Sequence, residues 1–303
     1  MLGWIRWSFI FAAAAFLGGE MSMPSAMADA SDDLEHLEQR AFKAAVRSAA
    51  DSVVQIQTIG GLDRVDDQSL ALGPATGVIV SDDGYIVSSA FHFASRPSSV
   101  LVRLPDGALE PAKLVGDDQS RMLTLLKVDV DQPLAPCRPA PLEEVRVGQW
   151  AISVGRAFQA DRVSVSVGIV SGLGRKHGRV IQTDANVSAA NYGGPLLDIE
   201  GNTLGVLVPM SPQSGGSESE SPVAGAEFYD SGIGFAVPLQ HVLEILPRWI
   251  QERELRRGVL GIGLKQGSPY STEPVVESVW PNSPAAAAGW RPGDRIVAIV
   301  HMF

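Results

Sequence analysis

One stretch decides the fold: Thr183-Asp184-Ala185-Asn186-Val187-Ser188-Ala189-Ala190-Asn191-Tyr192-Gly193-Gly194-Pro195-Leu196-Leu197. It follows a short apolar run, and its two adjacent glycines mark a tight backbone corner that feeds a buried strand. A turn signal at residues 198–202 and a strand-like run at residues 203–208 come next. This succession predicts a β-hairpin directly after the corner.

Short strand-like segments separated by turns fill most of the chain. In the first half they lie at residues 50–56, 77–80, 85–88, 100–104, 108–115 and 123–128. In the second half they lie at residues 150–154, 163–172, 180–183, 194–197, 203–208 and 233–237. Strands at this spacing predict an all-β fold of paired antiparallel barrels rather than a parallel α/β sheet. The proline-rich segment 131–141 should link the two halves.

The N-terminus has the layout of a secretory signal peptide. Arg6 precedes the apolar run 7–19, and small residues at 26–30 offer a cleavage site. We therefore expect a signal peptide at residues 1–30 and export to the periplasm or another extracytoplasmic compartment. An uncleaved anchor is the alternative, although the run is short for a membrane span.

Three further segments carry local signals. Residues 31–50 have a helical apolar face, which predicts a packing helix. The segment 211–231 is rich in Ser, Gly and Glu and should form a mobile surface loop. A second helix is expected from Pro238 towards Arg257, with Pro247 interrupting it.

Composition excludes several classes of function. The formal net charge of −10, without a clustered basic surface, argues against a nucleic-acid partner. A single cysteine, Cys137, permits neither an internal disulfide nor a multi-cysteine metal site, and the five histidines show no i,i+4 pairing. Gly261-Ile262-Gly263 lacks the third glycine of a dinucleotide fingerprint, and the glycine-rich segment 172–178 reads as a turn between strands. We expect no metal and no cofactor.

The opening stretch resembles the nucleophile loop of the HtrA/DegP (Do-like) branch of trypsin-like serine proteases. There the pattern reads Thr-Asp-Ala-Ala-Ile-Asn-Pro-Gly-Asn-Ser-Gly-Gly-Pro-Leu, which this sequence matches without a gap. The resemblance implies two antiparallel Greek-key β-barrels at about residues 51–140 and 144–250, within a protease-fold domain at 51–250. At the position of the family's nucleophilic serine, however, this chain has Tyr192.

The other two members of the family's Ser-His-Asp triad are also replaced. The spacing from Gly84-Tyr85-Ile86 places Phe91 where the resemblance expects the histidine. The flanking segments 118–121 and 123–127 place Met122 where it expects the aspartate. Without a base, the phenol of Tyr192 is a poor nucleophile.

The loop that would stabilise an oxyanion is altered as well. Its positions are occupied by Ala190, Asn191 and Gly193, and Ala190 replaces a family glycine. We therefore expect no catalytic residues. At the place where the resemblance expects a catalytic cleft, our hypothesis is that Phe91, Met122 and Tyr192 form an apolar plug or a shallow apolar groove for unfolded chains.

A displaced triad is the alternative for catalysis. His92 lies one residue past the expected position, and Ser188 lies four residues before Tyr192. A Ser188–His92 pair would need a rebuilt loop. The simpler interpretations are a surface or capping role for His92 and a bracing role for Asp184.

From residue 258 the chain resembles the start of an HtrA-type PDZ domain. Val259-Leu260-Gly261-Ile262 corresponds to the loop that binds a peptide carboxylate, and Pro292-Gly293-Asp294 follows the expected order. The resemblance implies peptide binding by added backbone pairing. The sequence stops at Phe303, so we expect a partial PDZ domain at 258–303 whose groove is incomplete.

The sequence thus predicts an HtrA-like protein that lacks the catalytic triad. We expect it to bind unfolded polypeptides, peptide C-termini or a partner protease in protein quality control. The resemblance also implies a homo-oligomer, a trimer in the family, or a mixed oligomer with active relatives. No membrane span is expected after signal cleavage. The alternative is an active serine endopeptidase that uses a rearranged site.

Overall fold

A computed structural model describes residues 25–62, 64–65, 68–69, 73–159, 161–210, 232–252, 255, 258–265 and 273–298. The chain divides into two units, Met1–Lys43 and Ala44–Phe303, and each is considered by itself. The predicted mobile loop at 211–231 and residues 1–24 of the predicted signal peptide lie outside the described residues.

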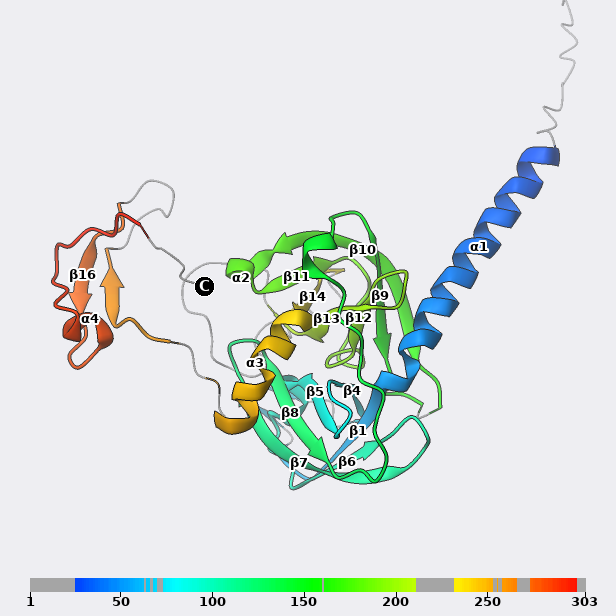
Figure 1. The fold of residues 1–303 in the computed structure, drawn as a ribbon, viewed down its shortest axis with the longest axis horizontal. Coiled ribbons are helices and arrows are strands. Elements are labelled where there is room, and N and C mark those ends of the chain that lie inside the picture. The colour runs from blue at the N-terminus through cyan, green and yellow to red at the C-terminus, as the bar shows by residue number, and fades with distance from the viewer. Residues whose placement is uncertain are drawn as a thin grey trace, which may run out of the picture. The chain divides into compact units, whose positions relative to one another are not determined.

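The N-terminal helix α1 runs through Ser25–Ala49 (Figure 1). It begins upstream of the start expected at Ser31 and takes in the small residues of the predicted cleavage site. Leu34 and Leu37 are exposed in the first unit, whereas Ala45 and Ala49 at the other end are buried in the second. Among the described helices, none has the length and apolar character that crossing a bilayer requires.

The first barrel closes with six antiparallel strands in the order β1-β4-β5-β8-β7-β6. Their bounds are β1 Val53–Ile59, β4 Ala75–Ile79, β5 Tyr85–Ser89, β6 Ser99–Arg103, β7 Leu109–Asp118 and β8 Leu123–Val128. Alternate residues of these strands turn inward and fill the barrel with branched side chains, among them Ile56, Ile86 and Leu126. A small hairpin, β2 Arg64–Val65 and β3 Gln68–Ser69, lies between β1 and β4 in the chain.

The second barrel closes in the order β10-β11-β14-β13-β12-β9. Its strands are β9 Trp150–Gly155, β10 Ser164–Gly174, β11 Val180–Thr183, β12 Pro195–Leu197, β13 Thr203–Val208 and β14 Gly234–Pro238. Counted in chain order within each barrel, both follow the sequence first, second, third, sixth, fifth, fourth. The two halves therefore share one topology, and the predicted all-β fold with two closed antiparallel barrels is confirmed.

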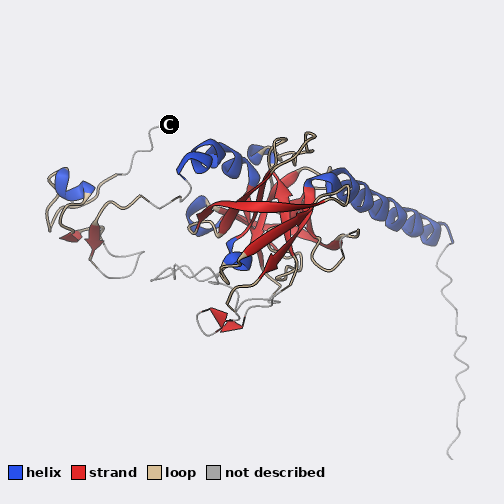
Figure 2. Ribbon diagram, turned by 90° about the horizontal axis from the view of Figure 1, so that it is seen from below, coloured by secondary structure: helices blue, strands red, loops and turns tan. Residues whose placement is uncertain are grey.

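A third group of buried side chains is shared by the two barrels and helix α3, Leu239–Glu252. Val78 and Leu125 come from the first barrel, Val206 and Phe235 from the second, and Trp249 from the helix. The link at 131–141 touches both barrels: Cys137 N donates to Ile79 O at 2.9 Å, and Ala140 N donates to Thr203 O at 3.0 Å. The barrels are thus joined by core as well as by chain, and Figure 2 shows their strands in red.

The expected interruption at Pro247 is wrong, because α3 continues through it to Glu252. Pro247 lacks only one backbone N–H, and the buried Leu246 and Trp249 beside it hold the helix against the shared core. Pro238 also belongs to β14 rather than to the helix.

The remaining elements are short. They are the 3₁₀ turns η1 Ala50–Ser52, η2 Ala90–Phe93 and η3 Leu142–Glu144, the turn of helix α2 Arg175–Gly178, and, after α3, strands β15 Ile262–Leu264 and β16 Val276–Val279 with helix α4 Pro284–Ala287. The glycine-rich segment at 172–178 joins β10 to β11, as the sequence predicts.

Candidate functional site

Phe91 is positioned by the short turn η2 that follows β5. The hydroxyl of Ser89 caps this turn by accepting the backbone N–H of Phe91 at 3.3 Å. Ala90, which lies between Ser89 and Phe91, donates its N–H to the carbonyl of Met122 at 2.8 Å. These two bonds bring the positions of the expected histidine and aspartate together at one end of the first barrel.

Met122 sits in a tight turn between β7 and β8. Its φ of 60° is unusual for a residue with a side chain. The turn is held by Asp118, whose buried carboxylate accepts the hydroxyl of Ser120 at 2.7 Å and the guanidinium of Arg121 at 2.7 Å. The thioether of Met122 packs into the core shared by the two barrels.

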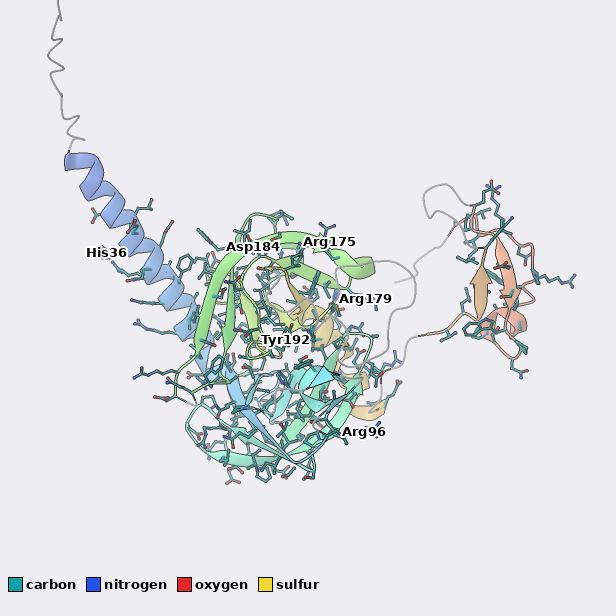
Figure 3. The ribbon with its side chains drawn as sticks, turned by 180° about the vertical axis from the view of Figure 1, so that it is seen from behind. His36, Arg96, Arg175, Arg179, Asp184 and Tyr192 are labelled. Atoms are coloured by element: carbon teal, nitrogen blue, oxygen red, sulfur yellow. The ribbon has the colours of Figure 1, made fainter. Side chains whose placement is uncertain are left out.

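Tyr192 lies at the corner that the opening stretch predicts. The carbonyl of Ser188 accepts the N–H of Asn191 at 2.8 Å and that of Tyr192 at 3.2 Å. Gly193, with φ of 84°, then turns the chain and donates its N–H to Leu207 O at 2.8 Å. The loop is a closed turn fixed to strand β13, and Tyr192 points to the junction of the barrels (Figure 3).

Phe91 and Tyr192 pack against each other. Their rings meet edge to face with centroids 5.5 Å apart, and only 8% and 4% of their surfaces are exposed. Ala94 completes this cluster, with Val187 and Ala189 at its margin. The plug is therefore a pair of aromatic rings, because the third expected member, Met122, belongs to the shared core instead.

Two backbone groups in the Tyr192 loop already have hydrogen-bond partners within the protein. In acyl transfer on this kind of loop, the amide of the nucleophilic residue and that two residues earlier donate to the developing charge. Here the amide of Tyr192 already donates to Ser188 O. The carbonyl of Ala190 is held by the hydroxyl of Thr76 at 2.9 Å, and that hydroxyl also accepts the N–H of Arg156 at 2.8 Å.

The Thr76 bridge is a feature that sequence reasoning missed. From β4 of the first barrel, the Thr76 hydroxyl fixes the position of Ala190, and no sequence motif around Thr76 predicts this contact. Asn191 is also fixed, because its side-chain carbonyl accepts the hydroxyl of Ser188 at 3.0 Å. All three predicted oxyanion-loop positions, Ala190, Asn191 and Gly193, therefore hold hydrogen bonds that close the loop on itself or on a neighbouring strand.

His92 lies in the site rather than on the open surface. Its Nε2 is 3.2 Å from the carbonyl oxygen of Tyr192, and its ring meets Phe91 edge to face at 5.4 Å. Burial lowers the pKa of His92 to about 4, although hydrogen bonds with the carbonyls of Tyr192 and Ala189 oppose that shift. In the described part of the chain its side chain bonds to these carbonyls and not to a serine hydroxyl.

The remaining candidates for a displaced triad are engaged elsewhere. The hydroxyl of Ser188 is donated to Asn191, as above. Asp184 accepts the N–H of Ile169 at 2.6 Å, which is the bracing role that the sequence predicts. In this conformation, Ser188 and His92 do not form a nucleophile–base pair.

The predicted peptide-binding loop lies before β15. Val259 and Leu260 are 55% and 47% exposed, and Gly261 has φ of 79°. The carbonyls of Leu260 and Gly261 accept the N–H groups of Ala285 and Trp280, at 3.0 and 2.8 Å. These bonds fix the loop to the end of β16 and to the first turn of α4, while the side chains of Val259 and Leu260 are exposed.

Two closed six-stranded barrels, with a glycine corner at their junction and a PDZ-like segment after helix α3, define a trypsin-fold protein of modular type. Comparison with known proteins agrees. A family model described as a trypsin-like peptidase domain matches residues 75–206, and a PDZ domain model matches residues 248–300. The predicted presence of a trypsin-like segment followed by a PDZ segment is thereby confirmed, and the bounds given to them from the sequence stay predictions.

Relatives and solved structures narrow the class. A probable periplasmic serine endoprotease, DegP-like, of Chlamydia trachomatis is 33% identical over 238 residues, which cover 74% of this chain and 45% of the relative. The protein of the same description from Hahella chejuensis is 31% identical and is covered to 48%. The HtrA-type protease AlgW, solved with a decapeptide, has a TM-score of 0.66 at 27% identity, with 85% of each chain covered.

A serine endoprotease from Yersinia pestis has a TM-score of 0.61 at 28% identity, over 83% of this chain and 79% of that one. The chain belongs to the HtrA family of trypsin-fold proteins with a C-terminal PDZ segment. It spans about half the length of the curated relatives it matches.

Proposed function

We propose that this chain is a non-hydrolytic member of the HtrA family that binds unfolded polypeptides, or a partner protease, in an exported compartment. One observation carries the proposal: the residue at the nucleophile position, Tyr192, is buried against Phe91, and its amide is donated to the carbonyl of Ser188. A side chain packed in this way is not presented to a substrate, and its amide is not available to a developing charge.

The chemistry of the neighbouring groups supports the same conclusion. Neither Phe91 nor Met122 accepts a proton, so the site lacks the base that would activate a hydroxyl. His92 accepts protons only weakly at neutral pH, because burial lowers its pKa to about 4. Loss of the nucleophile or base alone costs on the order of a millionfold in turnover in enzymes of this chemistry.

Binding is the function that remains for this scaffold. The exposed Val259 and Leu260 stand at the start of the segment matched by the PDZ model. The neighbour AlgW was solved with a decapeptide. We propose that the loop 259–262 takes the C-terminal carboxylate of a peptide and that the peptide extends along β15. The periplasmic description of the relatives supports export.

The catalytic part is tested with a fluorophosphonate probe, which labels an activated serine. The purified full chain is incubated with the probe and, separately, with unfolded casein. We expect no covalent adduct and no cleavage products, together with slower aggregation of a denatured client. A serine adduct, or casein fragments that appear in proportion to the chain, would establish the alternative of an active endopeptidase.

The binding part is tested by fluorescence polarisation with a labelled apolar peptide, once with a free C-terminus and once amidated. We expect binding only with the free carboxylate, and its loss in Leu260→Glu. Val297→Glu is the matched control, because Val297 is 85% exposed in the same segment but lies away from the loop in sequence. Equal loss in both variants would show a general charge effect instead of a site. Light scattering of the same sample determines the oligomeric state.

A further inference from the structure

A pocket of about 340 Å³ opens on the second unit, away from the Phe91–Tyr192 pair in sequence and contacts. Its described lining includes Ser120, Arg121, Arg179, Ile245, Arg248 and Leu255. Three of these residues carry guanidinium groups, and no described lining residue carries a carboxylate. We call this site the arginine pocket.

The three guanidinium groups come from three separate elements. Arg121 belongs to the turn between β7 and β8, Arg179 lies between α2 and β11, and Arg248 lies in α3. Figure 3 shows Arg179 on the side of the second barrel where α3 runs. Charges that the fold collects from such distant parts of the chain repel one another, so their convergence has a free-energy cost.

Part of that cost is offset by neighbouring carboxylates. The buried Asp118 pairs with Arg121 at 2.7 Å, and Glu252, one helical turn further along α3, pairs with Arg248 at 2.9 Å. Arg179 donates to the carbonyl of Ser120 at 3.4 Å. Burial and the nearby charge of Arg121 lower the pKa of Arg179, while Asp118 acts in the opposite direction. Arg121 and Arg179 therefore lie close enough to sense each other's charge.

We propose that the arginine pocket binds a small organic phosphate, a phosphomonoester with an apolar substituent. Planar guanidinium forks pair with phosphate oxygens through two parallel hydrogen bonds, and a phosphate offers enough oxygens to serve three forks from different directions. A single carboxylate has only two oxygens, too few to pair with three guanidinium groups in this way. Ile245 and Leu255 provide an apolar wall for the substituent. A volume of about 340 Å³ falls in the range of small-molecule sites.

Such a ligand would tie α3 to the β7–β8 turn. Leu255, just beyond α3, already donates its N–H to the carbonyl of Asp117 at 3.2 Å, so the chain after α3 contacts the end of β7, the strand that leads into the turn. A phosphate shared by Arg121 and Arg248 would add a connection between the turn and α3 itself. The ligand should therefore stabilise the folded chain by mass action.

The test is calorimetric titration of the full chain with inorganic phosphate, phenyl phosphate and acetate at constant ionic strength. We expect saturable binding of both phosphates, with phenyl phosphate tighter because of the apolar wall, and no binding of acetate. Arg179→Gln and Arg248→Gln should each weaken phenyl phosphate at least about tenfold, since each removes a charge-assisted pair. Arg248→Lys should restore part of the affinity.

Arg162→Gln is the matched control, because Arg162 is a 78% exposed surface arginine paired with Asp161. It should bind phenyl phosphate like the unmodified chain. Arg248 is 63% exposed, so its replacement leaves the core intact and keeps the test valid if Arg179→Gln fails to fold. Non-saturable heats, acetate binding as tightly as phosphate, or equal loss in Arg162→Gln would overturn the proposal.

Discussion

The edge of the Phe91 ring faces the ring of Tyr192, with 5.5 Å between centroids and an angle of 72° between planes. Phe91 comes from the first barrel and Tyr192 from the second, so this pair closes the junction at which a trypsin-fold protease would hold its histidine and serine. Edge-to-face pairs are attractive beyond the area that they bury. The two rings are therefore part of the packing between the barrels.

Removing either ring should destabilise the chain. We expect Phe91→Ala to lower the free energy of unfolding by about 3–5 kcal/mol, through lost burial and the cavity left behind. A double-mutant cycle with Tyr192→Ala should give a coupling of about 0.5–1.5 kcal/mol for the ring pair. Urea denaturation of the four proteins measures both quantities.

The control for this cycle is Phe158→Ala. Phe158 is 78% exposed, and its replacement should change the free energy of unfolding by less than about 0.5 kcal/mol. A coupling indistinguishable from zero would mean that the two rings stabilise the fold independently.

Restoring the serine alone should not restore hydrolysis. In Tyr192→Ser the new hydroxyl has Phe91 in place of a general base, so it stays protonated and weakly nucleophilic. We expect fluorophosphonate labelling and peptide cleavage to remain at the level of the buffer blank, with circular dichroism confirming the fold. Labelling above that of the parent chain would show that another group, with His92 as the first candidate, can serve as the base.

The stability of the chain should fall in mild acid because of His92. The pKa is lowered from 6.5 to about 4, so between these values the unfolded chain binds a proton that the folded chain does not. The contribution of the neutral imidazole to the free energy of unfolding is full above pH 6.5 and is lost as the pH falls towards 4. Its size is on the order of 3 kcal/mol.

His92→Gln isolates this effect, because glutamine can still donate to the carbonyl of Tyr192 but does not titrate. We expect the difference in free energy of unfolding between the two proteins to change between pH 7 and pH 4 and to be constant above pH 7. Parallel pH profiles would mean that His92 titrates alike in both states.

Gly193 should tolerate no side chain. Its φ of 84° is strained for other residues, and an added Cβ would overlap the carbonyl of Thr76 and come within 2.8 Å of the amide of Ser89. Gly107 has a similar φ of 94°, with no atom within 4 Å of the added Cβ. A replacement of Gly107 therefore measures the cost of the backbone strain alone.

We expect Gly107→Ala to cost about 1 kcal/mol and Gly193→Ala several times as much, since the second replacement also forces the barrels apart. Thermal unfolding of the two variants compares them directly. Equal costs would show that the corner can shift away from the first barrel.

The sequence predicts the barrels well because their signals are local. Short apolar runs and turn glycines define β4, β5, β12 and β13 without reference to distant parts of the chain. The family pattern then locates Phe91, Met122 and Tyr192 by spacing alone. Pro247 misleads for the opposite reason: the packing of Trp249 against the shared core outweighs the local signal of a helix break.

The partners of the site residues could not be predicted in the same way. The Thr76 hydroxyl reaches Ala190 across a separation of 114 residues, and His92 reaches the carbonyl of Tyr192 across 100. Spacing places Met122 beside the other two positions, yet its φ of 60° directs its side chain into a different cluster. The arginine pocket also depends on three elements whose meeting no single segment encodes.

The side chains shared by both barrels and by Trp249 have a thermodynamic consequence. Both barrels contribute side chains to this core. If one barrel unfolded alone, apolar side chains of the other barrel would be exposed to water. Heating should unfold both barrels and helix α3 in a single sharp transition, and a chain cut before Leu239 should lose its first barrel as readily as its second.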